Sequence, residues 1–258
     1  MRYITAFFMA WGNFFAIPCP CKLWDNNLRR LQLVFFPLIG IMMGIIWYFL
    51  YKGMMLLGLP VPIQSAILTV YPFIISGFIH LDGFMDCCDA ILSRRDLEER
   101  QRILKDSHVG AFSVISVVIL FMMFYSAIWS EMGDLNGLDP VGKGPFSCLI
   151  IIPFLTRACS AFGVLKFVPI GHSQYKASYD KDINKEYLII LTLLLGIPLV
   201  LLAIGRYWMP LLVAVITIAS HFIVMWHGRK QLGGMSGDIA GYALTIAECA
   251  GVTAMAIL

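Results

Sequence analysis

The run VGAFSVISVVILFMMFYSAIW, residues 109–129, contains no charged side chain and decides the fold class of this chain. At a rise of about 1.5 Å per residue, a helix of this length crosses the roughly 30 Å hydrocarbon core of a bilayer. Further apolar runs of similar length lie at residues 33–51, 62–81, 147–168, 187–205, 208–226 and 238–258. The sequence therefore predicts an all-α, polytopic integral membrane bundle of about seven transmembrane helices.

The composition of the whole chain supports a membrane protein. Of its 258 residues, 59% are hydrophobic and 14% are charged, whereas soluble domains carry about 25% charged residues. A net charge of +3 gives no cationic field that would indicate nucleic-acid binding. The cysteines are scattered without a CxxC pair, so a zinc site or disulfide framework is not indicated. We expect a single integral membrane domain over residues 1–258.

The distribution of basic residues predicts the orientation in the membrane. Lysines and arginines gather in the loops at 18–30, 93–108, 166–186 and 229–230, and the opposite loops carry Lys52, Lys143 and Arg206. Positive loops stay in the cytoplasm. We therefore expect a multi-pass protein of the cytoplasmic (inner) membrane, with residues 1–30 inside and Leu258 outside. A continuous helix over 62–81 would place Asp82 near the cytoplasmic boundary.

Shorter segments make local predictions. Residues 3–17 are too short for a comfortable crossing and end at Pro18, which favours an N-terminal interfacial or re-entrant helix. Asp96 and Glu99 form a capping box that begins a short amphipathic helix within the loop 93–108. Glu248 lies in an apolar run and needs a partner there.

The obvious partner for Glu248 is Arg157, which lies within the apolar run 147–168. We interpret this pair as structural rather than catalytic.

Three carboxylates, Asp82, Asp86 and Asp89, follow the second apolar run at positions i, i+4 and i+7. On an α-helix these positions share one face within two turns. Like charges repel at this spacing, and an uncompensated acid at the bilayer centre costs roughly 2.5–3.5 kcal/mol. A divalent cation removes both penalties, and Mg²⁺ or Mn²⁺ suits an open carboxylate site that substrate phosphates complete. The cluster predicts metal-dependent phosphate chemistry; the alternative is a solvated acidic helix end.

Two further constellations lie on the same predicted side of the membrane. Asp106 and Ser107 precede the run 109–129, where Asp106 could cap the helix or bind metal, and capping is the more common role. The helix N-terminus beside them suits a phosphate. His108 could carry a proton, although a lone interfacial histidine is more often a hydrogen-bonded structural residue.

The segment 229–241 opens the last apolar run and contains a glycine-rich loop. Gly233 and Gly234 permit a close approach of the backbone to a ligand, and Arg229 supplies charge that neutralises an anion. Ser236 and Asp238 follow directly. The alternative is a flexible positive-inside loop.

Several of these motifs, in this order, resemble the cobalamin synthase family. The resemblance rests on Phe36-Pro37-Leu38-Ile39-Gly40 with Gly44, His80-Leu81-Asp82-Gly83 with Asp86 and Asp89, Arg94-Arg95-Asp96, Asp106-Ser107 with Gly110, Thr156-Arg157, and Gly233-Gly234 with Ser236-Gly237-Asp238 and Glu248. Two features depart from the family pattern. Phe121-Met122-Met123 stands where a lysine is expected, and Asn13-Phe14-Phe15-Ala16-Ile17-Pro18 lacks the usual Thr-Arg.

The resemblance implies a transferase of cobalamin biosynthesis. In the implied reaction, the ribose hydroxyl of α-ribazole or its 5′-phosphate attacks adenosylcobinamide-GDP and expels GMP. Mg²⁺ would be the cofactor, bound by Asp82, Asp86 and Asp89. Asp106, or an acid not fully engaged by the metal, would accept the hydroxyl proton.

The remaining roles concern the phosphate site. Asp238, Ser236, Ser107 and the glycine loop would complete it, with Arg94, Arg95 and Arg229 as phosphate clamps. A homo-oligomer, or association with other cobalamin-pathway enzymes, is compatible with the sequence.

Two alternatives stay open. A CDP-alcohol-type phosphotransferase acting on a lipid would bind a metal ion through aspartates in the same way. The Asp-Gly-x-x-Ala-Arg sequence that begins the motif of that family is absent, since Phe84-Met85-Asp86 follows Gly83. An ion-coupled transporter could use intramembrane acids. The acids here gather at one predicted membrane face rather than at the midplane, and no inverted repeat is visible.

Overall fold

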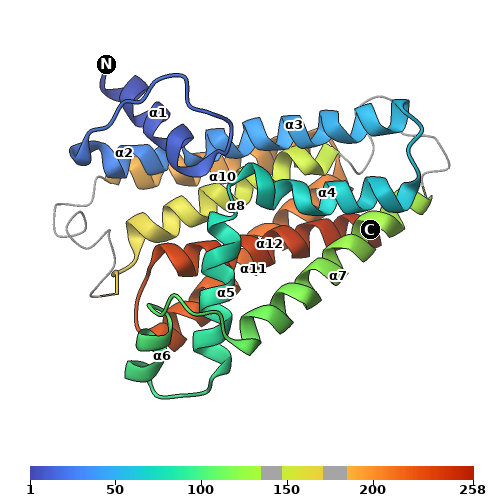
Figure 1. Ribbon diagram of the computed structural model, residues 1–258. Helices are drawn as coiled ribbons and strands as arrows, with labels where there is room; N and C mark the ends of the chain where they lie inside the picture. Colours follow the sequence, from blue (N-terminus) through green and yellow to red (C-terminus); the bar gives the residue numbers. More distant parts are fainter. Residues whose placement is uncertain (135–146, 171–184) are drawn as a thin grey trace.

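The computed structural model describes residues 1–134, 147–170 and 185–258, whose regular structure is helical throughout (Figure 1). In chain order the elements are α1 (Arg2–Phe14), the 3-10 turn η1 (Asn26–Leu28), α2 (Arg29–Val34), α3 (Phe36–Leu56), α4 (Val61–Ile75), α5 (Ile79–Leu92), α6 (Leu97–Ile103), α7 (Ala111–Asp134), α8 (Cys148–Lys166), α10 (Lys185–Ile204), α11 (Trp208–Leu232) and α12 (Gly237–Ile257). The predicted all-α class is confirmed. Lys143 and much of the basic loop 166–186 lie outside the described residues.

The apolar runs of the sequence correspond to helices, except that the run 62–81 is divided between α4 and α5. Among the described residues, α3, α7, α8, α10, α11 and α12 are long and apolar enough to cross a membrane, and α4 with α5 adds a bent seventh candidate. The predicted polytopic bundle is therefore confirmed. The N-terminal segment forms α1, which packs on α2 and α3 near one end of the bundle (Figure 1).

The prediction of one continuous helix over 62–81 is wrong. The chain turns by 90° between α4 and α5, because Gly77 and Phe78 both adopt left-handed backbone conformations, with φ of 64° and 60°. Glycine adopts this conformation freely, whereas a bulky residue such as Phe78 rarely does. The residue type at position 78 therefore does not indicate a turn. As a result α5 runs across the neighbouring long helices instead of continuing α4 (Figure 1).

The centre of the bundle is formed by α8 and α12. The apolar window of α8 is 83% buried and that of α12 is 67% buried. Gly40 and Gly44 let α3 approach α8 closely, since a Cβ at these positions would meet the backbone of Pro153 and Ile150 at 2.4 Å and 2.6 Å. Small residues commonly provide such contacts between membrane helices.

A buried ion pair joins the two central helices. Arg157 Nη1 of α8 lies 2.6 Å from Glu248 Oε1 of α12, and the side chains are 0% and 2% exposed. Thr156 Oγ1 donates to the same carboxylate oxygen at 3.3 Å. The predicted partnership is confirmed, and it fixes α8 against α12.

The predicted short helix within the loop 93–108 is confirmed as α6, and one half of the predicted capping box forms. The Asp96 carboxylate accepts a hydrogen bond from the Glu99 backbone N–H at 2.9 Å. The Glu99 carboxylate binds Arg102 one turn later, at 2.6 Å and 2.8 Å, instead of reaching back to the cap. Gln101 donates to the Leu232 carbonyl at 2.9 Å, which holds α6 against the end of α11.

Candidate active site at the crossing of α5 and α12

The first turns of α5 and α12 cross in direct backbone contact. A Cβ at Gly83 would lie 2.8 Å from Asp238 Cα, and one at Gly241 would lie 2.9 Å from the His80 carbonyl oxygen. Thr245 Oγ1 donates to the same carbonyl at 3.2 Å. Asp82 and Asp86, on either side of Gly83 in the sequence, are therefore brought to the N-terminus of α12, where Asp238 lies.

Four carboxylates gather around this crossing. Asp82 is exposed, while Asp86, Asp89 and Asp238 are partly buried. Asp86 interacts electrostatically with Asp82, Asp238 and Asp89, with Asp82 contributing most. In the part of the chain that the structure describes, no three His, Cys, Asp or Glu side chains are already arranged around a metal position. The site thus presents neighbouring carboxylates rather than a closed metal cage.

Asp89 has a different task from the other acids on α5. Its Oδ2 accepts a hydrogen bond from the Gly110 N–H at 2.8 Å, and its Oδ1 accepts one from the Ser113 N–H at 3.0 Å. A Cβ at Gly110 would overlap this carboxylate at 2.4 Å. Asp89 therefore caps α7 from a neighbouring helix, and both of its oxygens are engaged.

The predicted capping role of Asp106 is wrong, because Asp89 caps α7. Asp106 Oδ1 instead accepts a hydrogen bond from the His108 N–H at 3.0 Å and lies 2.6 Å from His108 Nδ1. This side-chain hydrogen bond lowers the pKa of Asp106 and raises the pKa of His108. Ser107 is exposed in the same turn. His108 is hydrogen-bonded, as expected for an interfacial histidine.

The glycine-rich loop is shaped mainly by contacts within the protein. Gly233 ends α11 in a left-handed conformation with φ of 80°. A Cβ at Gly234 would lie 2.9 Å from the Ile170 backbone nitrogen, so at this position another chain segment makes the close approach. Ser236 caps α12 through the Ile239 N–H at 3.2 Å and donates to Asp238 Oδ2 at 3.3 Å.

The predicted phosphate-binding arginines lie outside the first turns of α5 and α12, which form the crossing. Arg229 stacks its guanidinium 3.6 Å from the centre of the Phe167 ring. It lines a separate pocket of about 290 Å³ together with Lys230, Gly233 and Gly234. Arg94, in a left-handed conformation with φ of 55°, and Arg95 are exposed just beyond the end of α5.

A cleft of about 120 Å³ lies directly beside the crossing. It is lined by Phe14, Leu33, Phe36, Ile79, His80, Asp82, Ser160, Ala161, Val164, Gly237, Asp238 and Ala240. His80 is 8% exposed and packs against the rings of Phe14 and Phe36. Sequence reasoning missed Phe14 and Ser160, because nothing in their local pattern separates them from ordinary packing residues.

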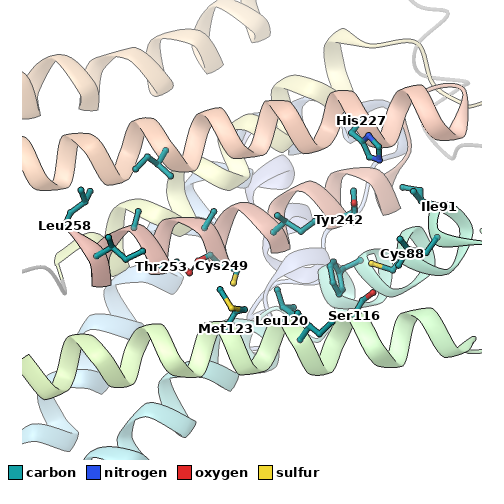
Figure 2. A pocket seen from close by; sticks show the side chains of 18 residues that line it. Cys88, Ile91, Ser116, Leu120, Met123, His227, Tyr242, Cys249, Thr253 and Leu258 are labelled. Carbon is teal, nitrogen blue, oxygen red and sulfur yellow. Dashed lines mark hydrogen bonds between the residues drawn. The ribbon is translucent and has the colours of Figure 1, made fainter.

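A larger apolar groove of about 720 Å³ lies on the other side of the crossing, between α7, α11 and α12. Figure 2 shows Cys88, Ser116 and Tyr242 near one end and Leu258 at the other. Its lining contains no Asp, Glu, Lys or Arg. It therefore offers mainly apolar contacts and no charged carboxylate or guanidinium group.

Comparison with known proteins relates the whole chain to one family. A family model described as cobalamin-5-phosphate synthase matches residues 6–256. An adenosylcobinamide-GDP ribazoletransferase of Clostridium botulinum (strain Alaska E43) is 35% identical over 244 residues, covering 95% of this chain and 94% of the relative. The protein of that name from Clostridium perfringens (strain SM101) is 34% identical over 259 residues, covering 99% of both. No solved structure matches the chain.

Proposed function

The chain belongs to the cobalamin-5-phosphate synthase family of transferases, and we propose that it joins α-ribazole 5′-phosphate to adenosylcobinamide-GDP with release of GMP. Family membership supports the assembly of the cobalamin nucleotide loop. The observation that carries the chemistry is the crossing of α5 and α12, which brings Asp82 and Asp86 beside Asp238. Carboxylates at a helix N-terminus suit the binding and transfer of phosphate groups through a cation.

The proposed reaction is one displacement at phosphorus. The ribose hydroxyl oxygen of the acceptor forms a bond to the phosphorus on the cobinamide side of the diphosphate. The bond from that phosphorus to the bridging oxygen breaks, and GMP leaves with the electron pair. The hydroxyl proton passes to a base on the protein, and the product is adenosylcobalamin 5′-phosphate.

We propose that Asp82, Asp86 and Asp238 hold a Mg²⁺ ion, which would supply charge neutralisation for the diphosphate and the departing GMP. The donor set consists of carboxylate oxygens, which Mg²⁺ prefers. Mg²⁺ sites in phosphate-transfer enzymes commonly use one or two carboxylates, and waters and substrate phosphates complete the shell. An open arrangement of this kind fits better than a closed cage. Asp89 is left out because both of its oxygens cap α7.

For the proton, we propose that His108 is the acceptor and that Asp106 positions it. Asp106 Oδ1 lies 2.6 Å from Nδ1 of His108, so the other ring nitrogen, Nε2, is not used by this contact. The side chain of His108 is 91% exposed. Hydrogen bonding to Asp106 raises the pKa of His108, which makes the neutral imidazole a stronger base for the hydroxyl proton. The loop that carries it is attached to α5, because Gly110 donates to Asp89.

We further propose that the site faces the cytoplasm in the inner membrane, with Arg94, Arg95 and Arg229 as phosphate clamps. The basic loops support this orientation. Arg94 and Arg95 follow α5 directly, and Arg229 precedes the glycine loop that leads into α12. A planar guanidinium binds phosphate oxygens in a bidentate manner.

The decisive experiment measures GMP release by detergent-purified protein supplied with both substrates, with and without Mg²⁺. We expect Mg²⁺-dependent GMP release matched by a cobalamin phosphate product. Asp82→Asn and Asp238→Asn should each reduce kcat by about 100-fold or more, because a charged ligand of the ion is lost. Asp25→Asn is the matched control, because Asp25 caps the distant turn η1 and asparagine also caps well. Near-normal turnover of folded Asp82→Asn and Asp238→Asn variants would refute the site.

A further inference from the structure

The cleft beside the crossing of α5 and α12 contains a buried polar atom without a protein partner. His80 is 8% exposed and lines this cleft. None of the described residues forms a hydrogen bond with its Nε2 atom. Leaving a buried polar atom unpaired is costly, and such atoms are uncommon in folded proteins. The Nε2 atom therefore needs a partner that the described part of the chain does not supply.

The imidazole ring of His80 is held in place by its neighbours. Its centroid lies 6.2 Å from that of the Phe14 ring, with the two rings stacked at 20°, and 5.5 Å from that of the Phe36 ring. The backbone carbonyl of His80 accepts a hydrogen bond from Thr245 Oγ1 at 3.2 Å. A phenylalanine could make the same ring contacts without burying a nitrogen. Packing alone therefore does not account for a histidine at this position.

The other buried polar side chain of the cleft already has a partner. Ser160 is 1% exposed, and its Oγ lies 2.8 Å from Nε2 of His221. Several described side chains have a buried polar atom without a hydrogen bond, but among them His80 alone lines this cleft. The unmet hydrogen-bonding capacity of the cleft is therefore concentrated on His80.

The surroundings of His80 favour a phosphate group as the missing partner. Gly237 and Asp238, from the first turn of α12, line the same cleft. A helix N-terminus attracts phosphate groups through its backbone N–H groups and its dipole. The negative charge of Asp82 and Asp238 would be offset by the proposed Mg²⁺. The cleft volume of about 120 Å³ is well above the roughly 10–15 Å³ that a single water needs, so a group of several heavy atoms can enter.

We propose that His80 is a substrate-binding residue whose Nε2–H donates a hydrogen bond to a phosphate oxygen of the diphosphate. The carboxylates of Asp82 and Asp238 belong to the same cleft. Their negative potential favours the tautomer that carries its hydrogen on Nε2 over the one that presents a lone pair there. The inference rests on the proposed function and adds a neutral donor to the charged groups that bind the diphosphate. The hydroxyl proton still passes to His108.

Two substitutions at His80 separate hydrogen bonding from packing. His80→Phe keeps a ring against Phe14 and Phe36 but removes both ring nitrogens, whereas His80→Gln keeps an N–H donor on a side chain of similar length. We expect His80→Phe to lower kcat/KM for adenosylcobinamide-GDP by about ten- to 100-fold, which corresponds to the loss of one hydrogen bond to a charged group. His80→Gln should recover most of this loss.

His227→Phe is the matched control. His227 lines the apolar groove on the other side of the crossing, so the same exchange of imidazole for phenyl is made away from the cleft. This variant should keep the kcat/KM of the wild type. Thermal unfolding in the same detergent shows whether each variant is folded.

A binding measurement tests the contact without the reaction. The chain contains five histidines, so the imidazole nitrogen signal of His80 can be assigned in NMR spectra of isotope-labelled protein by its loss in either His80 variant. Inorganic pyrophosphate serves as the probe for the diphosphate. Added together with Mg²⁺, it should move the Nε2 signal of His80 further than Mg²⁺ alone does, and the signal of His227 should stay in place.

The outcomes separate this inference from the proposed reaction. If GMP is released, but folded His80→Phe keeps the wild-type kcat/KM and pyrophosphate does not move the His80 signal, His80 does not bind the diphosphate and the proposed function stands. Equal losses in His80→Phe and His80→Gln without a signal shift would assign His80 a structural role and overturn the inference. If no GMP is released but pyrophosphate moves the His80 signal, the phosphate contact stands and the proposed reaction fails.

Discussion

Replacing Gly83 by alanine should separate α5 from α12 and slow the reaction. The added Cβ would lie 2.8 Å from Asp238 Cα and 2.9 Å from its carbonyl oxygen, and backbone atoms cannot rotate away. Ordinary contact begins at 3.4 Å, so the helices must move apart by about 0.6 Å. Overpacking of this kind costs about 1–3 kcal/mol, and a 1 Å misplacement in a site can cost about 100-fold in rate. We expect kcat to fall about ten- to 100-fold.

The assay is GMP release at saturating substrates and Mg²⁺, with thermal unfolding measured in the same detergent. Gly241→Ala, which would place a Cβ 2.9 Å from the His80 carbonyl oxygen, should act in the same direction. Gly53→Ala on α3 is the control, because its Cβ would meet nothing within 4 Å. If folded Gly83→Ala keeps the kcat and the unfolding temperature of the wild type, then close contact at this crossing does not position the acids.

Three other perturbations test neighbouring parts of the argument. Glu248→Gln leaves Arg157 buried without its counter-charge, so the free energy of unfolding should fall by about 3–5 kcal/mol; an unchanged unfolding curve in detergent would contradict this. Asp89→Ala should lower the free energy of unfolding by about 0.5–2 kcal/mol, because a helix cap is lost, and should speed amide exchange at the start of α7. The Mg²⁺ dependence of GMP release should stay the same. A weakened Mg²⁺ dependence would show that Asp89 is a ligand of the ion. Hydrogen bonding to Asp106 raises the pKa of His108, so the neutral base is lost as the pH falls through that raised pKa, and kcat should rise with pH. Asp106→Asn should lower kcat and shift the acidic side of the pH–kcat profile to lower pH. If that side of the profile does not shift, His108 is excluded as the base.

The features predicted correctly depend on forces that act over short stretches of chain. The spans follow from hydrocarbon thickness and side-chain polarity, which do not need tertiary information. Asp96 caps α6 because its partner, the Glu99 N–H, is three residues away. The pairing of Arg157 with Glu248 was found across the chain because a buried charge strongly demands a partner, and few partners exist within apolar runs.

The features predicted wrongly depend on partners that are distant in sequence. The left-handed conformation of Phe78 is unfavourable for a bulky residue, so the residue type itself does not indicate it. The spacing of Asp82, Asp86 and Asp89 correctly indicates one helix, but periodicity cannot reveal that the N-terminus of α7 occupies the last of these carboxylates. For the same reason Asp106, adjacent to α7, was the natural but wrong choice of cap.

One signal for the site was present in the sequence, in the spacing of its glycines. Gly237 and Gly241 stand four residues apart on α12, the spacing with which small residues let membrane helices approach. Asp238 lies between them, just as Gly83 lies between Asp82 and Asp86. Gly83 meets the backbone of Asp238 and Gly241 meets the backbone of His80, and these contacts bring the neighbouring acids together. That alternation separates a site built at a helix crossing from an acidic helix end exposed to solvent.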